Sequence, residues 1–221
     1  MLETEPHWVW LGGWSVPSEA YAGVLRERLS GATHSWLEPV PGAIDELKTH
    51  AVEGRASVVA GYSLGSHLIL EALETGWEPG VRVRLFAPVT TFVCRVPGED
   101  PSRVQPKQLR AFQRLLRADP AAAVANFDAF AGLSIPAASR ASWLESADVD
   151  ELAWGLEKLA ESRLSPSIFN GMRDRGVDLS AVVGAEDALI AGQLLEGLPA
   201  VTITDGVGHD LGDLLRASTE V

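Results

Sequence analysis

Three polar residues of this sequence, Ser63, Asp187 and His209, have the types and the order needed for nucleophilic catalysis. A serine hydroxyl is a weak nucleophile until a base takes its proton, and an imidazole serves as that base when a carboxylate fixes its tautomer. Serine, then acid, then histidine is one of the chain orders in which such triads occur. The three residues therefore predict acyl transfer through a covalent serine intermediate.

Ser63 lies at the centre of GYSLG, a G-x-S-x-G motif. The preceding ASVVAG is apolar and β-branched like a buried strand, and the following SHLILEALE has apolar residues at helical spacing. The serine therefore falls on a tight bend, where Gly61 and Gly65 would let two backbone segments approach closely. A tight glycine turn can be purely structural, but between a strand and a helix the motif predicts a nucleophile elbow.

The acid and the base are each predicted on a loop that follows a strand. Asp187 lies in VVGAEDALI, where Glu186 beside it and Asp205 after the next strand are the alternatives. We favour Asp187 because a G-x-x-D placement after the strand is typical of this triad. Among the five histidines, His209 in GVGHD alone combines the required order with a glycine-rich loop.

Acyl transfer also requires hydrogen-bond donors for the oxyanion. The backbone N–H of Leu64, at the start of the helix after the serine, is one predicted donor. The second is predicted in LGGWS, the loop after the first strand, as the N–H of Trp14. Gly12 and Gly13 could form only a tight turn, but such a turn would aim that N–H at the site. The Trp14 side chain would then form a wall of the substrate pocket.

Strands and helices alternate along most of the chain, which predicts the α/β class with a mostly parallel sheet of about six strands flanked by helices. The predicted strands lie within residues 7–14, 33–40, 57–61, 81–88, 179–184 and 200–205. Parallel strands of such a sheet bring the residues at their C-terminal ends to one edge. Ser63, Asp187 and His209 are therefore expected to meet there.

The alternation stops near Pro97 and resumes near residue 179. We therefore predict a core formed by residues 1–98 and 165–221, interrupted by a helical lid insertion over 99–164. Its predicted helices are PKQLRAFQRLLR, DPAAAVANFDAFAGL and DVDELAWGLEKLAESRL, with PAASRAS as a flexible joint. A further helix is predicted over LIAGQLLEGL in the core.

Composition limits the classes of protein and of partner that fit this sequence. The chain has 221 residues, 46% of them hydrophobic and 22% charged, as expected for one globular α/β domain. A single cysteine, Cys94, excludes an internal disulfide, and no spacing of ligand residues predicts a metal or another cofactor. MLETEPHWVW lacks a signal-peptide layout, so a cytoplasmic location is expected. A net charge of −12 argues against nucleic-acid or membrane partners.

One region has the opposite charge. Basic residues recur at helical spacing within 101–118, a segment without acidic residues. They are Arg103, Lys107, Arg110, Arg114 and Arg117. On a helix this spacing forms a single face, which we call the basic stripe, although Pro106 would place Arg103 just outside the helix. The basic stripe is either a solvated face or a docking surface for an anionic partner.

The motifs LGGW, GYSLGS, GAED and GVGHD together resemble the α/β-hydrolase superfamily over nearly the whole chain. The segment FAPVTTFVCRVPGED and the helices after it more narrowly resemble the pimeloyl-acyl-carrier-protein methyl ester esterases of biotin synthesis. This resemblance implies an α/β-hydrolase fold with a helical lid. It also implies a serine carboxylesterase that binds acidic acyl carrier protein and cleaves its pimeloyl methyl ester.

Two other functions are consistent with the same residues. One is a hydrolase of small esters or thioesters without a carrier partner, and the other is a ligand receptor that retains the fold without turnover. Four aromatic residues of the predicted insertion either line an acyl channel or form its core. They are Phe127, Phe130, Trp143 and Trp154.

Overall fold

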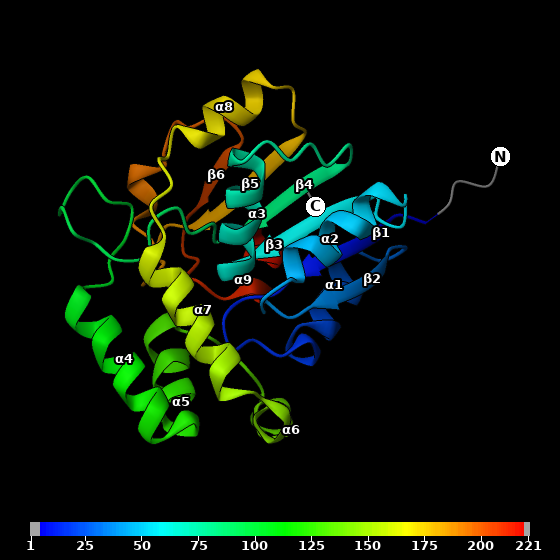
Figure 1. Ribbon diagram of the computed structural model, residues 1–221. Coiled ribbons are helices and arrows are strands. Elements are labelled where there is room, and N and C mark those ends of the chain that lie inside the picture. The colour runs from blue at the N-terminus through cyan, green and yellow to red at the C-terminus, as the bar shows by residue number, and fades with distance from the viewer. Residues whose placement is uncertain (1–4, 219–221) are drawn as a thin grey trace.

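The computed structural model describes residues 5–218. Residues 1–4, which begin the N-terminal segment MLETEPHWVW, lie outside the described residues, as do residues 219–221. A single parallel sheet with the strand order β2-β1-β3-β4-β5-β6 forms the centre of the molecule (Figure 1). Its strands are β1 (His7–Leu11), β2 (Thr33–Leu37), β3 (Val58–Tyr62), β4 (Arg82–Phe86), β5 (Leu179–Gly184) and β6 (Val201–Thr204). The predicted class and strand number are confirmed.

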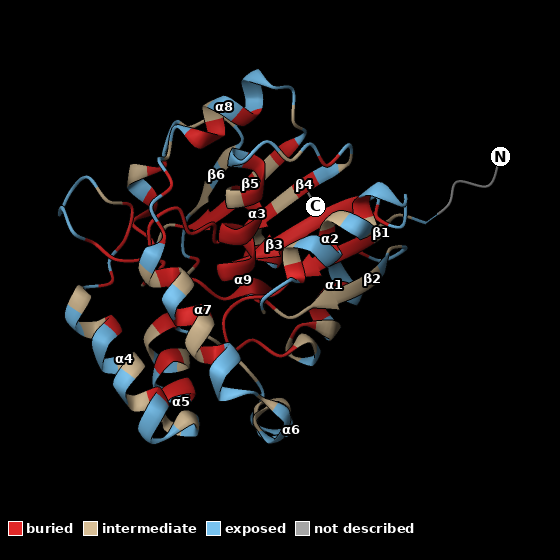
Figure 2. Cartoon of the chain, viewed as in Figure 1, coloured by how far each residue is buried: buried red, intermediate tan, exposed pale blue. Residues whose placement is uncertain are grey.

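How deeply each strand is buried depends on whether it lies at the centre or at the edge of the sheet. Every residue of β3 is buried, whereas the edge strands β2 and β6 are mostly half-exposed (Figure 2). Helices cover both faces of a parallel sheet, which accounts for an apolar, fully buried β3; β4, also inside the sheet, is buried only at Val83, Leu85 and Phe86. In β1 the Trp10 ring stacks on Trp8, Trp36 and Phe86 at centroid distances of 5.5, 5.9 and 5.5 Å. This aromatic stack joins β1 to its neighbour β2 and, past β3, to β4.

Helices flank the sheet on both sides (Figure 1). Helices α1 and α9 pack against each other, and α3 packs against both α2 and α8. The flanking helices are α1 (Ala22–Arg28), α2 (Ala43–Val52), α3 (Leu64–Glu74), α8 (Ile168–Asp174) and α9 (Leu211–Ala217). No helix in the described part of the chain is long and apolar enough to cross a membrane.

Four further helices come between β4 and α8 in the sequence, and they gather at one end of the molecule (Figure 1). They are α4 (Pro106–Ala118), α5 (Pro120–Ala131), α6 (Ala137–Ser146) and α7 (Val149–Glu161). Their ends follow from local sequence: Pro106 begins α4, and the Asp119 and Asp148 side chains accept hydrogen bonds from the first turns of α5 and α7. We call these four helices the helical segment.

Two predicted local structures are wrong. PAASRAS is not a flexible joint, because residues 137–142 belong to α6, where Arg140 forms an ion pair with Asp128 of α5. LIAGQLLEGL is not a helix apart from one 3₁₀ turn. The N–H groups of Leu189 and Ile190 instead bond the Asp187 carboxylate, and the Leu189 carbonyl accepts from Arg103. Helical hydrogen bonds are therefore replaced by local bonds to the Asp187 side chain and by one bond to the distant Arg103 backbone.

Candidate active site

Ser63 occupies the bend between β3 and α3 with strained backbone angles, φ 52° and ψ −113°. Its N–H donates to the carbonyl of Phe86 on β4 at 2.9 Å. A Cβ on Gly61 would lie 2.7 Å from Ile69 and 2.8 Å from the Ser66 Cα, so only glycine fits there. A serine with positive φ that persists in a well-packed bend is a feature of functional sites, and here it has the geometry of a nucleophile elbow.

The structure brings Ser63, His209 and Asp187 into one hydrogen-bonded chain. The Ser63 Oγ lies 2.9 Å from the His209 Nε2, and the His209 Nδ1 lies 2.7 Å from the Asp187 Oδ2. The three side chains follow β3, β6 and β5 at the C-terminal edge of the sheet. All three residues are buried, at 5%, 1% and 0% exposure respectively. A proton can therefore pass from the serine to the imidazole, away from bulk water.

The Asp187 carboxylate is held in place by backbone donors. Its second oxygen, Oδ1, accepts hydrogen bonds from the N–H groups of Leu189 and Ile190 at 2.7 and 2.9 Å. The alternative acids, Glu186 and Asp205, are both exposed. Only Asp187 among the three has a hydrogen bond to His209 within residues 5–218. This arrangement orients the imidazole with its Nδ1–H toward the carboxylate.

The loop after β1 lies directly against the elbow. The Gly65 N–H donates to the Gly12 carbonyl at 2.9 Å, and a Cβ on Gly65 would lie 2.0 Å from the Leu11 carbonyl oxygen. The N–H groups of Trp14 and Leu64 have no hydrogen-bond partner among the described residues. Two unused donors near a nucleophilic serine suit an oxyanion hole.

The Trp14 side chain connects this loop to the helical segment. It is buried, its Nε1–H donates to the Leu152 carbonyl of α7 at 2.8 Å, and its ring packs edge-on against Phe127 of α5 at 4.7 Å. A Cβ on Gly155 would lie 2.6 Å from the Trp14 ring. Two helices of the segment therefore lie over the loop that carries the predicted oxyanion donor.

Tyr62 supports the catalytic histidine, a role that the sequence did not reveal. Its hydroxyl donates to the backbone carbonyl of His209 at 3.0 Å. Burial raises the pKa of Tyr62 well above its ordinary value, so the hydroxyl stays a donor. The signal that the sequence offered for this role was the position of Tyr62 directly before Ser63 in the G-x-S-x-G motif. The contact itself joins residues 147 positions apart, which no local pattern predicts.

Asp210, next to the histidine, joins three parts of the molecule. It caps α9, accepting from the Gly212 N–H at 2.8 Å. Its other oxygen accepts from the Tyr21 hydroxyl at 3.1 Å and from the Ser134 N–H, between α5 and α6, at 2.9 Å. Burial and the Asp210 carboxylate raise the pKa of Tyr21 well above its ordinary value. Asp210 therefore ties the helical segment to the histidine loop.

Replacing Asp210 with alanine is expected to lower the free energy of unfolding by about 2–4 kcal/mol. The change removes a helix cap and leaves two donors, the Tyr21 hydroxyl and the Ser134 N–H, without their partner. Urea denaturation would measure the loss. Asp213→Ala is the matched control, because that exposed carboxylate has only a surface ion pair with Arg216 and should change stability by under about 1 kcal/mol. Equal losses in both variants would contradict the assigned role.

His67, one helical turn beyond Ser63, does not take part in the triad. It is fully buried, its Nδ1 lies 2.9 Å from the Val89 carbonyl, and its Nε2 lies 3.3 Å from the Glu71 carboxylate. The hydrogen bond from this histidine lowers the pKa of Glu71. His67 is therefore a packed residue of α3.

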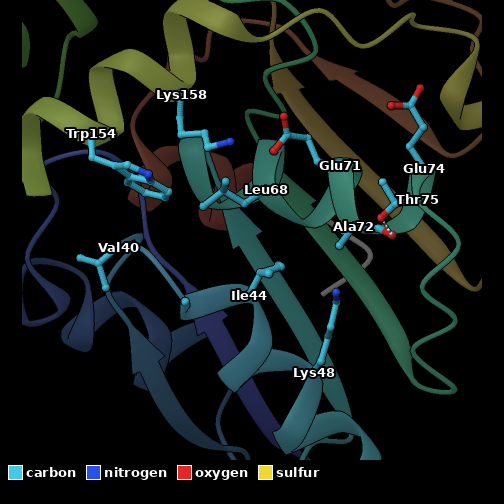
Figure 3. Close-up of a pocket in the computed structure, with 11 residues that line it drawn as sticks. Val40, Ile44, Lys48, Leu68, Glu71, Ala72, Glu74, Thr75, Trp154 and Lys158 are labelled. Carbon is cyan, nitrogen blue, oxygen red and sulfur yellow. Dashed lines mark hydrogen bonds between the residues drawn. The ribbon is translucent and has the colours of Figure 1, made fainter.

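The aromatic residues of the helical segment divide between its core and its surface cavities. Phe127 and Phe130 pack around Phe112 at centroid distances of 5.6 and 5.7 Å, which places them in the core of the segment. Trp154 lines a cavity of about 450 Å³ between α2, α3 and α7 (Figure 3). Trp143 lines a different cavity, next to the loop after β1.

The basic stripe is exposed along its whole length. Lys107, Arg110, Arg114 and Arg117 lie on α4, and Arg103 precedes it, as predicted. No residue of the stripe forms an ion pair within the described part of the chain, and the one hydrogen bond of the Arg103 guanidinium there is to the Gln193 amide oxygen, at 3.4 Å. The apolar side of the helix is turned inward through Leu109 and Leu116. The stripe is therefore a continuous positive face open to solvent.

Solved structures similar to this chain share its fold. An esterase from Exiguobacterium antarcticum matches with a TM-score of 0.70 and 13% identity, over 92% of this chain and 85% of that one. A hydrolase from Oleispira antarctica matches with a TM-score of 0.64 and 14% identity, over 98% and 86%. A structure from a study of carboxylesterases of Nitrososphaera gargenis gives 0.63 and 13%, over 98% and 86%. No protein-family model and no curated protein matches the sequence.

These similarities, together with the sheet order and the nucleophile elbow, establish the α/β-hydrolase fold. The class of protein defined by fold and site is thus an α/β-hydrolase-fold protein with an assembled Ser63–His209–Asp187 triad. At identities of 13–14% the solved structures carry no further detail about this chain. Substrate and partners have to be argued from its own residues.

Proposed function

We propose that this protein is a serine hydrolase that cleaves carboxylic esters. The observation that carries the proposal is the continuous chain from the Ser63 Oγ through the His209 imidazole to the Asp187 carboxylate, with contacts of 2.9 and 2.7 Å. A nucleophile, its base and an orienting acid in this geometry have one well-understood use, which is acyl transfer. The fold is common among esterases, which agrees with this reaction but does not establish it.

In the proposed reaction, the Ser63 Oγ attacks the ester carbonyl while the His209 Nε2 takes its proton. Asp187 holds the Nδ1–H and stabilises the imidazolium that forms. The protonated histidine then gives its proton to the leaving alkoxide, and the alcohol departs from an acyl-serine. A water molecule activated by the same histidine hydrolyses the acyl-enzyme and returns the serine to its starting state. Atoms and charges balance without a cofactor.

The oxyanion formed in each step would be stabilised by the N–H groups of Leu64 and Trp14. Support comes from their lack of other partners and from the Gly65–Gly12 hydrogen bond, which holds their two segments together. The helical segment would act as a lid, because α5 and α7 contact Trp14 and the serine below is nearly inaccessible to water. Excluding water strengthens the interaction of such donors with the developing charge.

For the substrate, we propose the methyl ester of pimeloyl-acyl carrier protein, as in biotin synthesis. The sequence resemblance in residues 81–130 supports this choice, and the exposed basic stripe offers a surface for an acidic carrier. In a protein of net charge −12, a positive face on a segment without acidic residues would orient such a partner. The carrier would dock on α4 while its flexible arm delivers the acyl chain beneath the lid.

Reversing three charges of the stripe, Lys107, Arg110 and Arg114 each to glutamate, is expected to lower kcat/KM for pimeloyl-carrier methyl ester at least tenfold, mainly through KM. Electrostatic docking speeds encounter and weakens with salt, so the wild-type rate should also fall with ionic strength. Hydrolysis of a short p-nitrophenyl ester should change less than about twofold, because that substrate needs no carrier surface.

The matched control reverses three exposed arginines away from α4, namely Arg26, Arg55 and Arg173. It changes the net charge equally and should leave carrier hydrolysis within about twofold of wild type. If the wild type cleaves the small ester but not the carrier substrate, a general ester or thioester hydrolase is supported. If it binds esters without releasing product, a ligand receptor is supported and the esterase proposal is wrong.

A further inference from the structure

A glycine of the helical segment packs directly against the side chains of both residues whose N–H groups form the predicted oxyanion hole. A Cβ on Gly155 of α7 would lie 2.6 Å from the Trp14 Cδ1 and 3.2 Å from the Leu64 Cδ2. Glycine is unfavourable inside a helix because it loses the most conformational freedom on folding, and the backbone of Gly155 does not have a positive φ. The close approach to Trp14 therefore requires glycine here, and the backbone conformation does not.

The same face of α7 also binds the indole nitrogen of Trp14. The buried residues of this helix recur at the spacing of one helical face, and they are Leu152, Gly155, Leu156 and Leu159. The Trp14 Nε1–H donates to the Leu152 carbonyl at 2.8 Å. A helical carbonyl also accepts from the residue four positions on, so the indole forms a second bond to an oxygen with two lone pairs. The Trp14 ring is therefore fixed both at its nitrogen and against the Gly155 Cα.

Two further contacts hold this ring and the residue after it. The Phe127 ring of α5 packs edge-on against Trp14 at a centroid distance of 4.7 Å. The Arg140 guanidinium of α6 donates to the Ser15 carbonyl and to both carboxylate oxygens of Asp128. Ser15 has a positive φ of 57°, a conformation uncommon for serine that the surrounding structure has to maintain. Helices α5, α6 and α7 therefore contact two consecutive residues of the predicted oxyanion loop.

We propose that docking of the helical segment on Trp14 sets the position of the Trp14 N–H in the oxyanion hole, with Gly155 and the Leu152 carbonyl as the positioning groups. The inference rests on the proposed function, in which this N–H stabilises the oxyanion of acyl transfer. The fixed indole and the N–H belong to the same residue, so a displaced ring moves the backbone that carries the donor. The helical segment therefore completes the site in addition to covering the serine.

A segment that only covers the serine and a segment that positions the donor predict opposite results when the contact with Trp14 is loosened. Loosening a cover admits a small ester more easily, so kcat/KM rises. Loosening a positioning contact lets the donor move away from the oxyanion, so kcat falls while KM changes little. The loss appears in kcat because the donor acts on charge that develops in the transition state.

Gly155→Ala is expected to lower kcat for a short p-nitrophenyl ester by about tenfold to a hundredfold, with KM within about twofold of wild type. The added methyl group pushes against the rigid indole ring, so the donor is displaced. The loss is smaller than the roughly 10²–10³-fold that follows outright removal of an oxyanion donor. Trp14→Phe keeps an aromatic ring but removes the bond to the Leu152 carbonyl, and it should lower kcat about tenfold.

The matched control is Gly171→Ala on α8, the same substitution in a helix where an added Cβ meets nothing within 4 Å. It should leave both kcat and KM within about twofold of wild type. Thermal unfolding of each variant gives its melting temperature, and all rates are measured well below that temperature.

Inhibition by an alkyl trifluoromethyl ketone gives a readout that a loss of folded protein does not change. The Ser63 Oγ adds to the ketone carbon while His209 takes the serine proton, which leaves a tetrahedral oxyanion in the oxyanion hole. The inhibition constant does not depend on the fraction of molecules that are folded, whereas the rate does. We expect the inhibition constant of Gly155→Ala to rise by the same factor as its kcat/KM falls.

An unchanged or raised kcat in either Trp14→Phe or Gly155→Ala, or an inhibition constant equal to that of wild type, overturns the inference and leaves the helical segment as a cover alone. Equal losses in Gly155→Ala and Gly171→Ala also overturn it. The proposed function is judged separately on the unsubstituted protein, where an esterase activity that Ser63→Ala abolishes supports that function whatever the other variants do. A wild type that hydrolyses no ester overturns both proposals.

Discussion

Replacing Ser63 with alanine is expected to lower kcat/KM for ester hydrolysis by about 10⁴-fold or more, with little change in melting temperature. The side chain supplies the attacking oxygen, so without it no acyl-enzyme forms and only the residual catalysis of the remaining site persists. Hydrolysis of a short p-nitrophenyl ester measures the rate. A burst of nitrophenol, expected for the wild type when deacylation is slower than acylation, should be absent in the variant.

The same assay tests the choice of acid. Asp187→Asn is expected to lower kcat by about 10⁴-fold, because the amide favours the wrong imidazole tautomer while leaving the packing nearly unchanged. Glu186→Gln, one residue away, is the matched control and should stay within about twofold of wild type, since that side chain is exposed. Near-normal activity in Asp187→Asn would remove the triad assignment even if Ser63→Ala were inactive.

Gly65→Ala is expected to lower the free energy of unfolding by about 3–5 kcal/mol and esterase activity at least a hundredfold. The added Cβ would lie 2.0 Å from the Leu11 carbonyl oxygen and 2.5 Å from that of Gly12. Both contacts are with backbone, so neither can be relieved by a side-chain rotation. The loop after β1 has to move away, which breaks the Gly65–Gly12 hydrogen bond and displaces the predicted oxyanion donor.

The control for this change is Gly171→Ala on α8, where an added Cβ meets nothing within 4 Å and the backbone is helical. Alanine there should raise stability by about 0.5–1 kcal/mol, because glycine loses more conformational freedom when it folds into a helix. Urea denaturation and soluble yield measure both variants. If Gly65→Ala has wild-type stability and activity, the close approach of elbow and loop is not required.

The sequence alone was sufficient to predict the α/β class, all six strands and the residues of the triad. These features rest on local signals: short runs rich in apolar and β-branched residues, glycines at 61 and 65 around the serine, and polar residues placed after strands. A parallel sheet then converts chain order into spatial proximity, because the C-terminal ends of its strands share one edge. Local pattern and global topology agree here, so little else was needed to bring Ser63, Asp187 and His209 together.

Local patterns failed where tertiary contacts determine the backbone. The segment from Leu189 has a helical composition, yet its N–H groups bond the Asp187 carboxylate, a partner that helical propensity does not register. Residues 136–142 were predicted to be a joint, but they lie in or border α6, where Arg140 bonds Asp128. In the first case the deciding carboxylate is two and three residues back in the chain, and in the second it lies twelve residues away on a different helix.

Only the tertiary structure decided which residues support and surround the triad. The choice of Asp187 over Glu186 and Asp205 and the Tyr62 contact with the His209 carbonyl both depend on groups brought together from distant elements. Chain periodicity reports which face of an element is apolar, but it carries no information about which distant polar group lies opposite. The sequence therefore determined the fold and the candidate reacting groups, and packing determined their partners.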